Sequence, residues 1–333
     1  MKLLVVTDAW RPQVNGVVTT LATLADQLAP RGWSTEFVHP GEFTSFPCPT
    51  YPEIKLSVLP YRRLSARIAA ARPDALHIAT EGPLGAAARR YCLERGHRYT
   101  SAYHTRFPEY VRARTRLPLA ATYRWLRRFH DPAQALMVPA PAVRRDLLAR
   151  GFTNTVPWTH GVDLEVFTPG HRERLATARP IFLYVGRVAI EKNISAFLEL
   201  DLPGSKWVVG AGPLRAKLER AHPDVHFAGI QTPTELARFY RAADVFVFPS
   251  LTDTFGLVML EALACGTPVA AYPVGGPVDV IGTSPAGVLD TDLRSACLSA
   301  LDIRRETARA HAERFSWAAA VLQFERYLAP FGA

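Results

Sequence analysis

The sequence predicts an α/β protein made of two doubly wound, parallel-sheet domains with a cleft between them. Short apolar strands alternate with helical stretches along the whole chain, and this alternation is typical of parallel sheets flanked by helices. The length of 333 residues is long for a single core and fits two domains of ordinary size. A hydrophobic content of 48% with scattered charge indicates a soluble globular chain rather than a disordered one.

The N-terminal half is expected to form one domain over residues 1–165, opening with a strand at residues 3–6. Residues 40–60 are rich in proline and aromatic residues and are expected to be an irregular excursion. Further strands are expected at 35–38, 75–78, 100–103 and 135–138, and helices at 17–29, 65–71, 84–94, 119–128 and 142–150.

The C-terminal half repeats this plan after a linker expected at residues 166–180, where Pro169 and Gly170 open a polar run. Its domain is expected to cover residues 181–315. The final segment, 316–333, contains an amphipathic helix at 317–328 that is expected to pack back on the N-terminal domain. Strands are expected at 181–185, 207–209, 225–227, 245–248 and 269–272.

A net charge of +9 predicts attraction to nucleic acid, an anionic membrane surface or a phosphorylated substrate, and composition does not choose among them. One segment between residues 106 and 129 combines basic and aromatic side chains. Such a segment could bind a lipid surface or single-stranded nucleic acid. Alternatively, its arginines are only the solvated face of a helix and its aromatic residues belong to the core. Its arginines are Arg106, Arg112, Arg114, Arg116, Arg124, Arg127 and Arg128, and its aromatic residues are Tyr110, Tyr123, Trp125 and Phe129.

The expected cellular compartment follows from signals that the sequence lacks. It has no apolar run near the roughly 18 residues that span a membrane. The opening apolar run is too short for a signal-peptide core and meets Asp8 at once. The 4 cysteines show no paired or metal-type spacing, which fits reduced thiols. We therefore expect a cytoplasmic protein.

Two carboxylates, Asp253 and Glu261, flank the start of a helix that follows the apolar strand at 245–248. Ligands of open α/β sheets bind on this side of the strands. Gly256 allows close backbone approach, and the free N–H groups of residues 255–258 suit a phosphate. The alternative is a surface loop capped by Asp253, with Glu261 on a solvated helix face.

Two cations follow the first strand of the second half: Arg187 comes directly after Gly186, and Lys192 lies five residues later. At a strand end they can clamp a diphosphate, although isolated loop cations are often only solvated surface. Gly210-Ala211-Gly212 imitates a dinucleotide-binding turn, but Arg215 replaces the third glycine and no acidic residue closes the next strand. NAD binding is therefore rejected, while a base or phosphate still fits this turn.

In the first half, Asn15 and Gly16 open a helix after the first strand, and Gly16 is either a ligand-side or a simple turn residue. His104 ends a strand. It is either a structural hydrogen-bonding group or, facing a cleft, the best candidate to position a reacting hydroxyl. Asp290-Thr291-Asp292 imitates a metal-binding pair, but its place before a helix favours capping.

Taken together, these elements resemble the family 4 (group 1) glycosyltransferases, which are retaining, nucleotide-sugar-dependent enzymes. The resemblance implies the GT-B fold, with two Rossmann-like domains facing a central cleft. It spans nearly the whole chain and rests on the order and spacing of several motifs. These are Pro12-Gln13-Val14-Asn15-Gly16-Val17, His104-Thr105-Arg106-Phe107-Pro108, Gly161-Val162-Asp163 with Phe167 and Pro169, Gly186-Arg187 with Lys192, Gly210-Ala211-Gly212-Pro213-Leu214, the acidic pair, and Glu261-Ala262-Leu263-Ala264-Cys265-Gly266-Thr267-Pro268-Val269.

The resemblance implies a role for each matching position. Arg187 and Lys192 would hold the donor diphosphate, and Glu261 would bind the ribose hydroxyls. Asp253 would bind the hydroxyls of the transferred sugar, and His104 would lie near its reactive carbon. The remaining implied site residues are Gly212, Phe255, Gly256, Leu257 and Val258 for the donor, Asn15 and Arg106 for the acceptor, and Gly16 for both.

The implied reaction is transfer of a hexose from a UDP- or GDP-linked donor to a hydroxyl acceptor, without a metal or other cofactor. A lipid acceptor at an anionic membrane is one expectation, and nucleic acid is not an expected partner. Three positions depart from the family pattern: Asp253 replaces the usual Glu, Ala211 a common acidic residue, and His160 a common Asn. A nucleotide-sugar epimerase or hydrolase, and a basic nucleic-acid-binding protein, are the alternatives.

Overall fold

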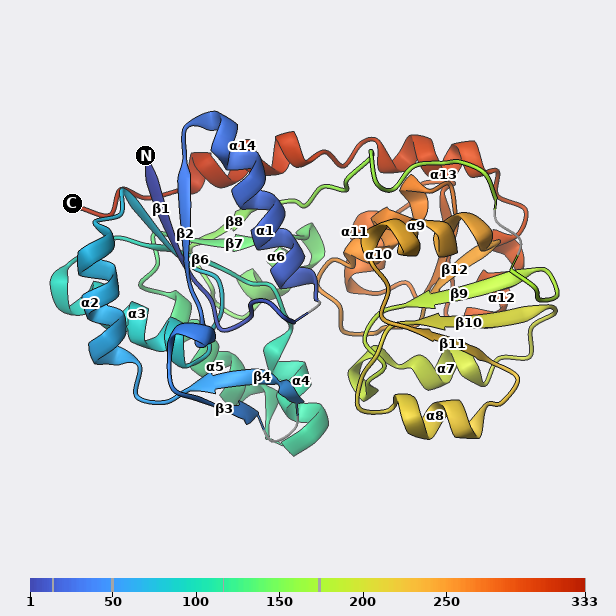
Figure 1. Ribbon diagram of the computed structural model, residues 1–333, viewed down its shortest axis with the longest axis horizontal. Helices are drawn as coiled ribbons and strands as arrows, with labels where there is room; N and C mark the ends of the chain where they lie inside the picture. Colours follow the sequence, from blue (N-terminus) through green and yellow to red (C-terminus); the bar gives the residue numbers. More distant parts are fainter. Residues whose placement is uncertain (14, 49–50, 116, 173–174, 333) are drawn as a thin grey trace. The chain divides into compact units, whose positions relative to one another are not determined.

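A computed structural model describes residues 1–13, 15–48, 51–115, 117–172 and 175–332 (Figure 1). Val14, Arg116 and residues 173–174 of the expected linker lie outside these ranges, and the side chain of Arg114 is also outside the description. The chain forms two compact units. One contains Met1–Thr159 and Trp317–Ala333, and the other contains His160–Ser316. The second unit thus begins at His160, six residues before the expected linker.

The first unit is built on a six-stranded sheet in the order β2-β1-β5-β6-β7-β8, with every neighbouring pair parallel. Each strand predicted in this half is present, and β8 is added. A three-residue strand that ends in proline gives too little alternation to be predicted. The strands are β1 (Lys2–Val6), β2 (Ser34–Val38), β5 (Ala75–Ile78), β6 (Thr100–Ala102), β7 (Ala135–Val138) and β8 (Thr155–Pro157).

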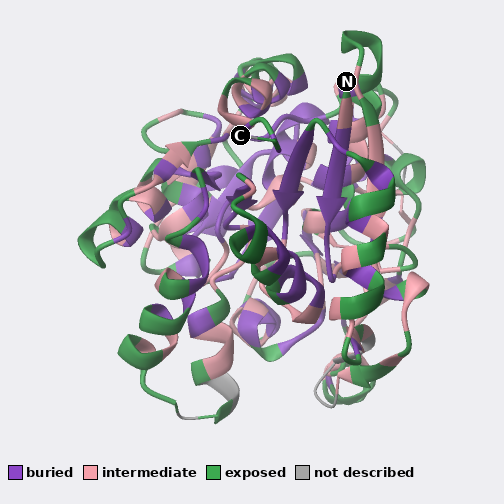
Figure 2. Cartoon of the chain, turned by 90° about the vertical axis from the view of Figure 1, so that its left-hand side faces the viewer, coloured by how far each residue is buried: buried purple, intermediate pink, exposed green. Residues whose placement is uncertain are grey.

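Helices cover both faces of this sheet, because successive side chains of a strand point to opposite faces. Leu4 and Val6 of β1 pack in one cluster with residues of α2 and α3. Leu3 and Val5 pack in another cluster with residues of α1 and α14. Figure 2 shows the strands as buried ribbons flanked by helices with exposed outer faces. The helices are α1 (Gly16–Leu28), η1 (Ala29–Arg31), η2 (Pro40–Glu42), α2 (Tyr61–Ala71), α3 (Pro83–Arg95), α4 (Phe107–Thr115), α5 (Leu119–His130), α6 (Pro141–Ala149) and α14 (Trp317–Tyr327).

One expectation for this unit is wrong, and one helix was not predicted. Residues 40–60 are not an irregular excursion, because β3 (Ser45–Cys48) and β4 (Tyr51–Ser57) form an antiparallel pair. Pro47 belongs to this pair, which is allowed because a two-stranded sheet has only edge strands. The helix that was not predicted is α4. It tolerates Pro108 in its first turn, where a missing N–H costs no intrahelical hydrogen bond.

The second unit contains another six-stranded parallel sheet, in the order β11-β10-β9-β12-β13-β14. From β9 the chain adds β10 and β11 on one side of the sheet, and it then adds β12, β13 and β14 on the other side. The boundary between β9 and β12 is therefore a topological switch point. The predicted class of two parallel α/β sheets is confirmed. The strands are β9 (Ile181–Val185), β10 (Ser205–Val209), β11 (His226–Gly229), β12 (Val245–Phe248), β13 (Val269–Ala271) and β14 (Gly287–Leu289). The helices are η3 (Ile190–Lys192), α7 (Ile194–Leu198), α8 (Arg215–Ala221), α9 (Pro233–Ala242), α10 (Leu257–Ala264), α11 (Gly275–Val280), α12 (Leu293–Ala300) and α13 (Arg305–Ala312).

Candidate functional site

The loops that follow β9, β10 and β12 meet at the carboxyl edge of the second sheet, on both sides of the switch point. This edge is where open α/β sheets bind ligands. Gly212, after β10, packs directly on the loop after β9: a Cβ at this position would lie 2.4 Å from the Val188 carbonyl oxygen. The glycine therefore has a packing role that the sequence comparison with a dinucleotide turn did not reveal.

Lys192 and Asp253 come together at this edge, where Lys192 Nζ forms an ion pair with Asp253 Oδ1. The pair is largely buried, with 22% of the Lys192 side chain and 13% of the Asp253 side chain exposed. Two further hydrogen bonds join the same segments: Asn193 Nδ2 donates to Pro249 O at 3.1 Å, and Thr252 Oγ1 donates to Glu191 O at 3.1 Å. Lys192 is therefore held against the loop after β12.

The second oxygen of Asp253, Oδ2, is buried and accepts no hydrogen bond from the part of the chain that the structure describes. A buried carboxylate oxygen without a donor is costly, so such an atom is a natural acceptor for a ligand hydroxyl. Arg187 is partly exposed at the same edge, and its backbone carbonyl accepts a hydrogen bond from Tyr184 Oη at 2.7 Å.

Helix α10 begins beside this pair with its backbone N–H groups uncapped by a side chain. Its N-cap is Gly256, whose φ of +89° is in the left-handed region that glycine adopts without strain. Phe255 is buried against the ring of His160, with ring centroids 5.2 Å apart. The reading of Asp253 as a simple helix cap is therefore wrong, because Asp253 pairs with Lys192 instead. An uncapped helix start suits an anion, and the donor-binding role implied for Phe255, Gly256, Leu257 and Val258 stays a prediction.

Glu261 lies one turn into α10, where its Oε2 accepts a hydrogen bond from Tyr240 Oη at 2.9 Å. Burial raises the pKa of Glu261 to about 7, and the hydrogen bond from Tyr240 opposes the rise. Tyr240 belongs to α9 and is fully buried. Glu261 is only partly exposed and its carboxylate is bonded to a buried tyrosine, which does not fit a fully solvated helix face.

In the first unit, Asn15 caps α1, since its Oδ1 accepts from Val18 N at 3.0 Å, and Gly16 is the first helical residue. His104 follows β6 and packs edge-on against Trp158, with ring centroids 5.6 Å apart. Arg106 forms ion pairs with Asp146 at 3.1 Å and with Glu109 at 3.7 Å. Its guanidinium therefore has structural partners within the unit, in addition to any role toward an acceptor.

Two buried polar residues were missed by sequence reasoning. Tyr240 was missed because its partner Glu261 is distant in sequence. Asp8 follows β1 and accepts hydrogen bonds from Leu84 N at 2.9 Å and Gly85 N at 3.3 Å, so it caps α3 from another segment. Burial raises the pKa of Asp8 to about 6. An acidic residue two positions after a buried strand was the available signal for Asp8.

Other predictions concern sites away from these edges. Asp292 caps α12, because its Oδ1 accepts from Arg294 N at 3.0 Å, so capping is the correct interpretation of the aspartate pair. Within the described ranges, no cluster of three or more His, Cys, Asp or Glu side chains is arranged to hold a metal ion. No described helix combines the length and apolar character that crossing a membrane requires.

Two family profiles match the chain: Glycosyltransferase Family 4 over residues 14–166, and Glycosyl transferases group 1 over residues 179–301. A GDP-mannose-dependent alpha-mannosyltransferase of Mycobacterium tuberculosis is 30% identical over 317 residues, which cover 87% of this chain and 83% of the relative. The sulfoquinovosyl transferase SQD2 of Arabidopsis thaliana is 31% identical over 318 residues, 86% of this chain. The chain spans 62% of the length of SQD2.

The fold also matches solved structures. The structure of Anabaena HepE in complex with UDP and glucose aligns with a TM-score of 0.74 at 16% identity. The alignment covers 98% of this chain and 98% of HepE. At this identity the likeness concerns the fold alone.

Proposed function

Because the chain belongs to the glycosyltransferases of family 4, group 1, we propose that it transfers a hexose from a UDP- or GDP-linked sugar to a hydroxyl acceptor with retention at the anomeric carbon. The observation that carries this proposal is the carboxyl edge of the second sheet. There, Lys192, Asp253 and Glu261 surround the uncapped start of α10. The M. tuberculosis relative named for GDP-mannose supports a nucleotide-sugar donor, and HepE was solved with UDP.

The donor diphosphate is placed against cationic and backbone donors. Negative charge grows on the leaving diphosphate as the glycosidic bond breaks, so fixed positive groups lower the barrier. Lys192, Arg187 and the N–H groups at the start of α10 would supply that charge. We propose that these groups suffice without a metal ion.

The two acids would bind the two sugar rings of the donor. Asp253 Oδ2 is a buried acceptor for a sugar hydroxyl, while Oδ1 stays paired with Lys192. The ammonium of Lys192 has three donors, so it can hold Asp253 and a phosphate oxygen together. Glu261 would accept hydrogen bonds from the ribose hydroxyls, and Gly212 would allow the nucleotide to approach the loop after β10.

The acceptor would use the first unit. In the proposed step, the acceptor hydroxyl oxygen bonds to the anomeric carbon on the face from which the diphosphate leaves, and its proton passes to a donor phosphate oxygen. His104 and Gly16 would position the reacting groups, and Asn15 and Arg106 would support them from α1 and the loop after β6.

A lipid acceptor at an anionic membrane is supported by α4, α5 and the loop between them. Phe107, Leu117 and Trp125 are 37%, 52% and 46% exposed, and the rings of Phe107 and Trp125 lie 5.8 Å apart. The exposed side chains of Arg124 and Arg128 accompany Trp125 on α5. Exposed apolar and cationic groups together favour the interface of an anionic bilayer. Co-sedimentation with phosphatidylglycerol vesicles but not phosphatidylcholine vesicles is expected, and binding to neither would contradict it.

The proposed activity is tested by incubating the purified chain with UDP-, GDP- and ADP-sugars, with and without alcohol acceptors. We expect donor consumption to need the acceptor and to fall about 100-fold or more in Lys192→Ala and in Glu261→Ala. The exposed Lys217 and Glu199 provide matched controls, because Lys217→Ala and Glu199→Ala remove similar charges elsewhere on the unit. Isomerised donor without acceptor would indicate an epimerase, and full activity of both site variants would refute the assignment.

A further inference from the structure

A second basic site lies at the amino edge of the same sheet, opposite the edge that carries Lys192 and Asp253. A pocket of about 360 Å³ is lined by Arg172, Leu175, Thr177 and Arg179. Arg179 precedes β9 and Asp244 precedes β12, so both lie where these strands begin. This volume is at the small end of the range of about 300–1,000 Å³ that is typical of small-molecule sites.

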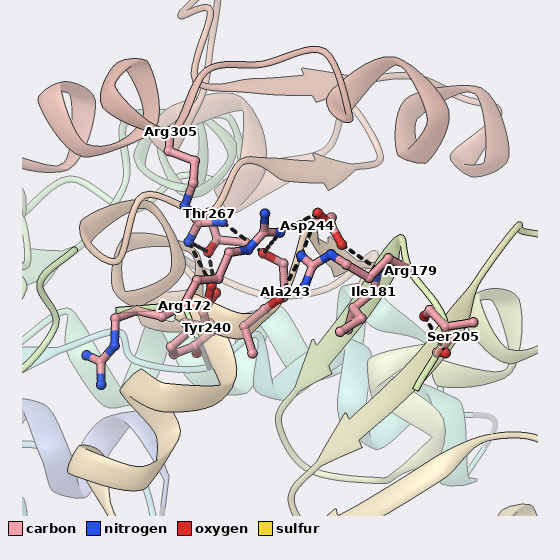
Figure 3. Close-up of polar contacts among 12 residues, drawn as sticks. Arg172, Arg179, Ile181, Ser205, Tyr240, Ala243, Asp244, Thr267 and Arg305 are labelled. Carbon is pink, nitrogen blue, oxygen red and sulfur yellow. Dashed lines mark hydrogen bonds and ion pairs between the residues drawn. The ribbon is translucent and has the colours of Figure 1, made fainter. Parts of the chain in front are cut away.

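Two guanidinium groups share one carboxylate at this edge, and a third guanidinium group lies nearby (Figure 3). Arg172 and Arg179 both donate through NH2 to Oδ1 of Asp244, the latter at 2.8 Å. The other oxygen of Asp244 accepts from Ile181 N at 2.7 Å. Arg305 lies behind them, donating to Ala243 O at 2.9 Å and through its other terminal nitrogen to Thr267 Oγ1 at 3.0 Å. One negative charge therefore stands against three positive charges.

The surrounding positive charge shifts the pKa values of Arg305 and Asp244. Burial, together with the positive charges of Arg172 and Arg179, lowers the pKa of Arg305 to about 10. Although burial acts in the opposite direction, hydrogen bonds from Arg179, Ile181 and Arg172 hold the pKa of Asp244 below its usual value. Asp244 is therefore ionised at neutral pH and still does not balance the cluster.

The arginines retain capacity to bind an anion. Their side chains are 38% and 40% exposed, and Nε of Arg172 is buried without a hydrogen-bond partner among the described residues. Thr177 adds a donor: its Oγ1 accepts a hydrogen bond from Trp207 Nε1 at 3.3 Å, which leaves its own proton available. Two forked cations and a hydroxyl form a donor set that suits a phosphate. Leu175 supplies an apolar wall for a small organic group.

We propose that Arg172, Arg179 and Thr177 form a binding site for a small soluble phosphomonoester, separate from the donor site. The ligand would take hydrogen bonds from the two guanidinium groups and from the threonine hydroxyl, and it would compete with the Asp244 carboxylate for the two arginines. This site does not depend on the proposed glycosyl transfer.

Inorganic phosphate at constant ionic strength is the probe, with binding followed by calorimetry and by the Nε–H resonances of the arginines. Phosphate is expected to shift the Arg172 Nε–H resonance. Arg179→Gln is expected to weaken this binding about tenfold or more, because it removes a charge-assisted donor. Arg304→Gln is the matched control, since that arginine side chain is 81% exposed on the same unit. Equal binding by both variants would overturn the site.

Two further variants separate the site from misfolding and from the donor edge. Thr177→Val keeps every charge and is expected to weaken phosphate binding severalfold, whereas Asp244→Asn removes the competing anion and is expected to tighten it. No change in either variant would overturn the site. Lys192→Ala is expected to leave the Arg172 shift intact, and loss of that shift would show that phosphate binds only at the donor edge.

Discussion

Removal of the Tyr240 hydroxyl tests how Glu261 is kept ionised. Tyr240 Oη donates to Glu261 Oε2 at 2.9 Å, and burial has raised the pKa of Glu261 to about 7. A hydrogen bond to a charged group is worth about 1.5–3 kcal/mol, so Tyr240→Phe should raise this pKa further, by about 1–2 units. At pH 7 the ionised fraction of Glu261 would then fall from about one half to roughly a tenth or less.

Nucleotide affinity should report this change, because only the carboxylate accepts hydrogen bonds from both ribose hydroxyls. In the native chain, the affinity for the preferred nucleoside diphosphate is expected to fall as the pH drops through about 7. In Tyr240→Phe, the same fall should occur about 1–2 pH units higher, which weakens binding about fivefold or more at pH 7 and restores it near pH 9. Calorimetric titrations between pH 6 and 9.5 measure both profiles.

The isosteric variant Glu261→Gln is the control for this experiment, since it cannot titrate and should give a flat profile in the same range. Thermal unfolding of each variant, without nucleotide, separates loss of binding from loss of the fold. Identical midpoints in the native chain and in Tyr240→Phe would refute the role of Tyr240. A pH dependence that survives in Glu261→Gln would show that another group titrates.

The remaining predictions concern sugar choice and acid stability. Asp253→Glu adds one methylene beside Lys192, so the ratio of kcat/KM between two hexose donors is expected to change while nucleotide affinity stays within about twofold; an unchanged ratio would remove Asp253 from sugar selection. Burial lowers the pKa of His77 to about 3, so its folded form resists protonation and stability is lost as the pH falls below about 6.5. Between pH 6.5 and 4.5, the free energy of unfolding, measured in urea, should therefore fall by about 2–3 kcal/mol less in His77→Gln than in the native chain. An equal fall in both chains would refute this.

The sequence predicted those features that depend on local pattern. The alternation of Leu3, Leu4, Val5 and Val6 between two helical layers follows from strand geometry, because the strand is apolar on both faces. The loops after β9 and β12 were predicted to lie at the ligand-binding edge, because parallel strands have their carboxyl ends at the same edge of a sheet. Asn15 was also placed correctly at the start of α1.

Features that depend on contacts between distant segments were not predictable. The pairing of Lys192 with Asp253 joins residues 61 positions apart, and the contact of Tyr240 with Glu261 joins residues 21 apart. Neither pairing has a local signature. The β3–β4 hairpin was missed for another reason, since Pro47 and its neighbours were interpreted as breakers, although proline is tolerated in a strand that has a free edge.

The two edges of the second sheet should bind anions by different means. Helices that follow strands begin at the carboxyl edge, where the free N–H groups of α10 already favour negative charge. At the amino edge, α9 ends and offers carbonyl oxygens, so Arg172 and Arg179 donate to Ala243 O and Ala242 O before they can meet a ligand. An anion there depends on side-chain donors, namely the two guanidinium groups and the Thr177 hydroxyl, because the end of a helix disfavours negative charge. Loss of one arginine should therefore weaken phosphate binding at the amino edge more than loss of Lys192 weakens phosphate binding at the carboxyl edge. The reverse order would contradict the assignment of these two edges.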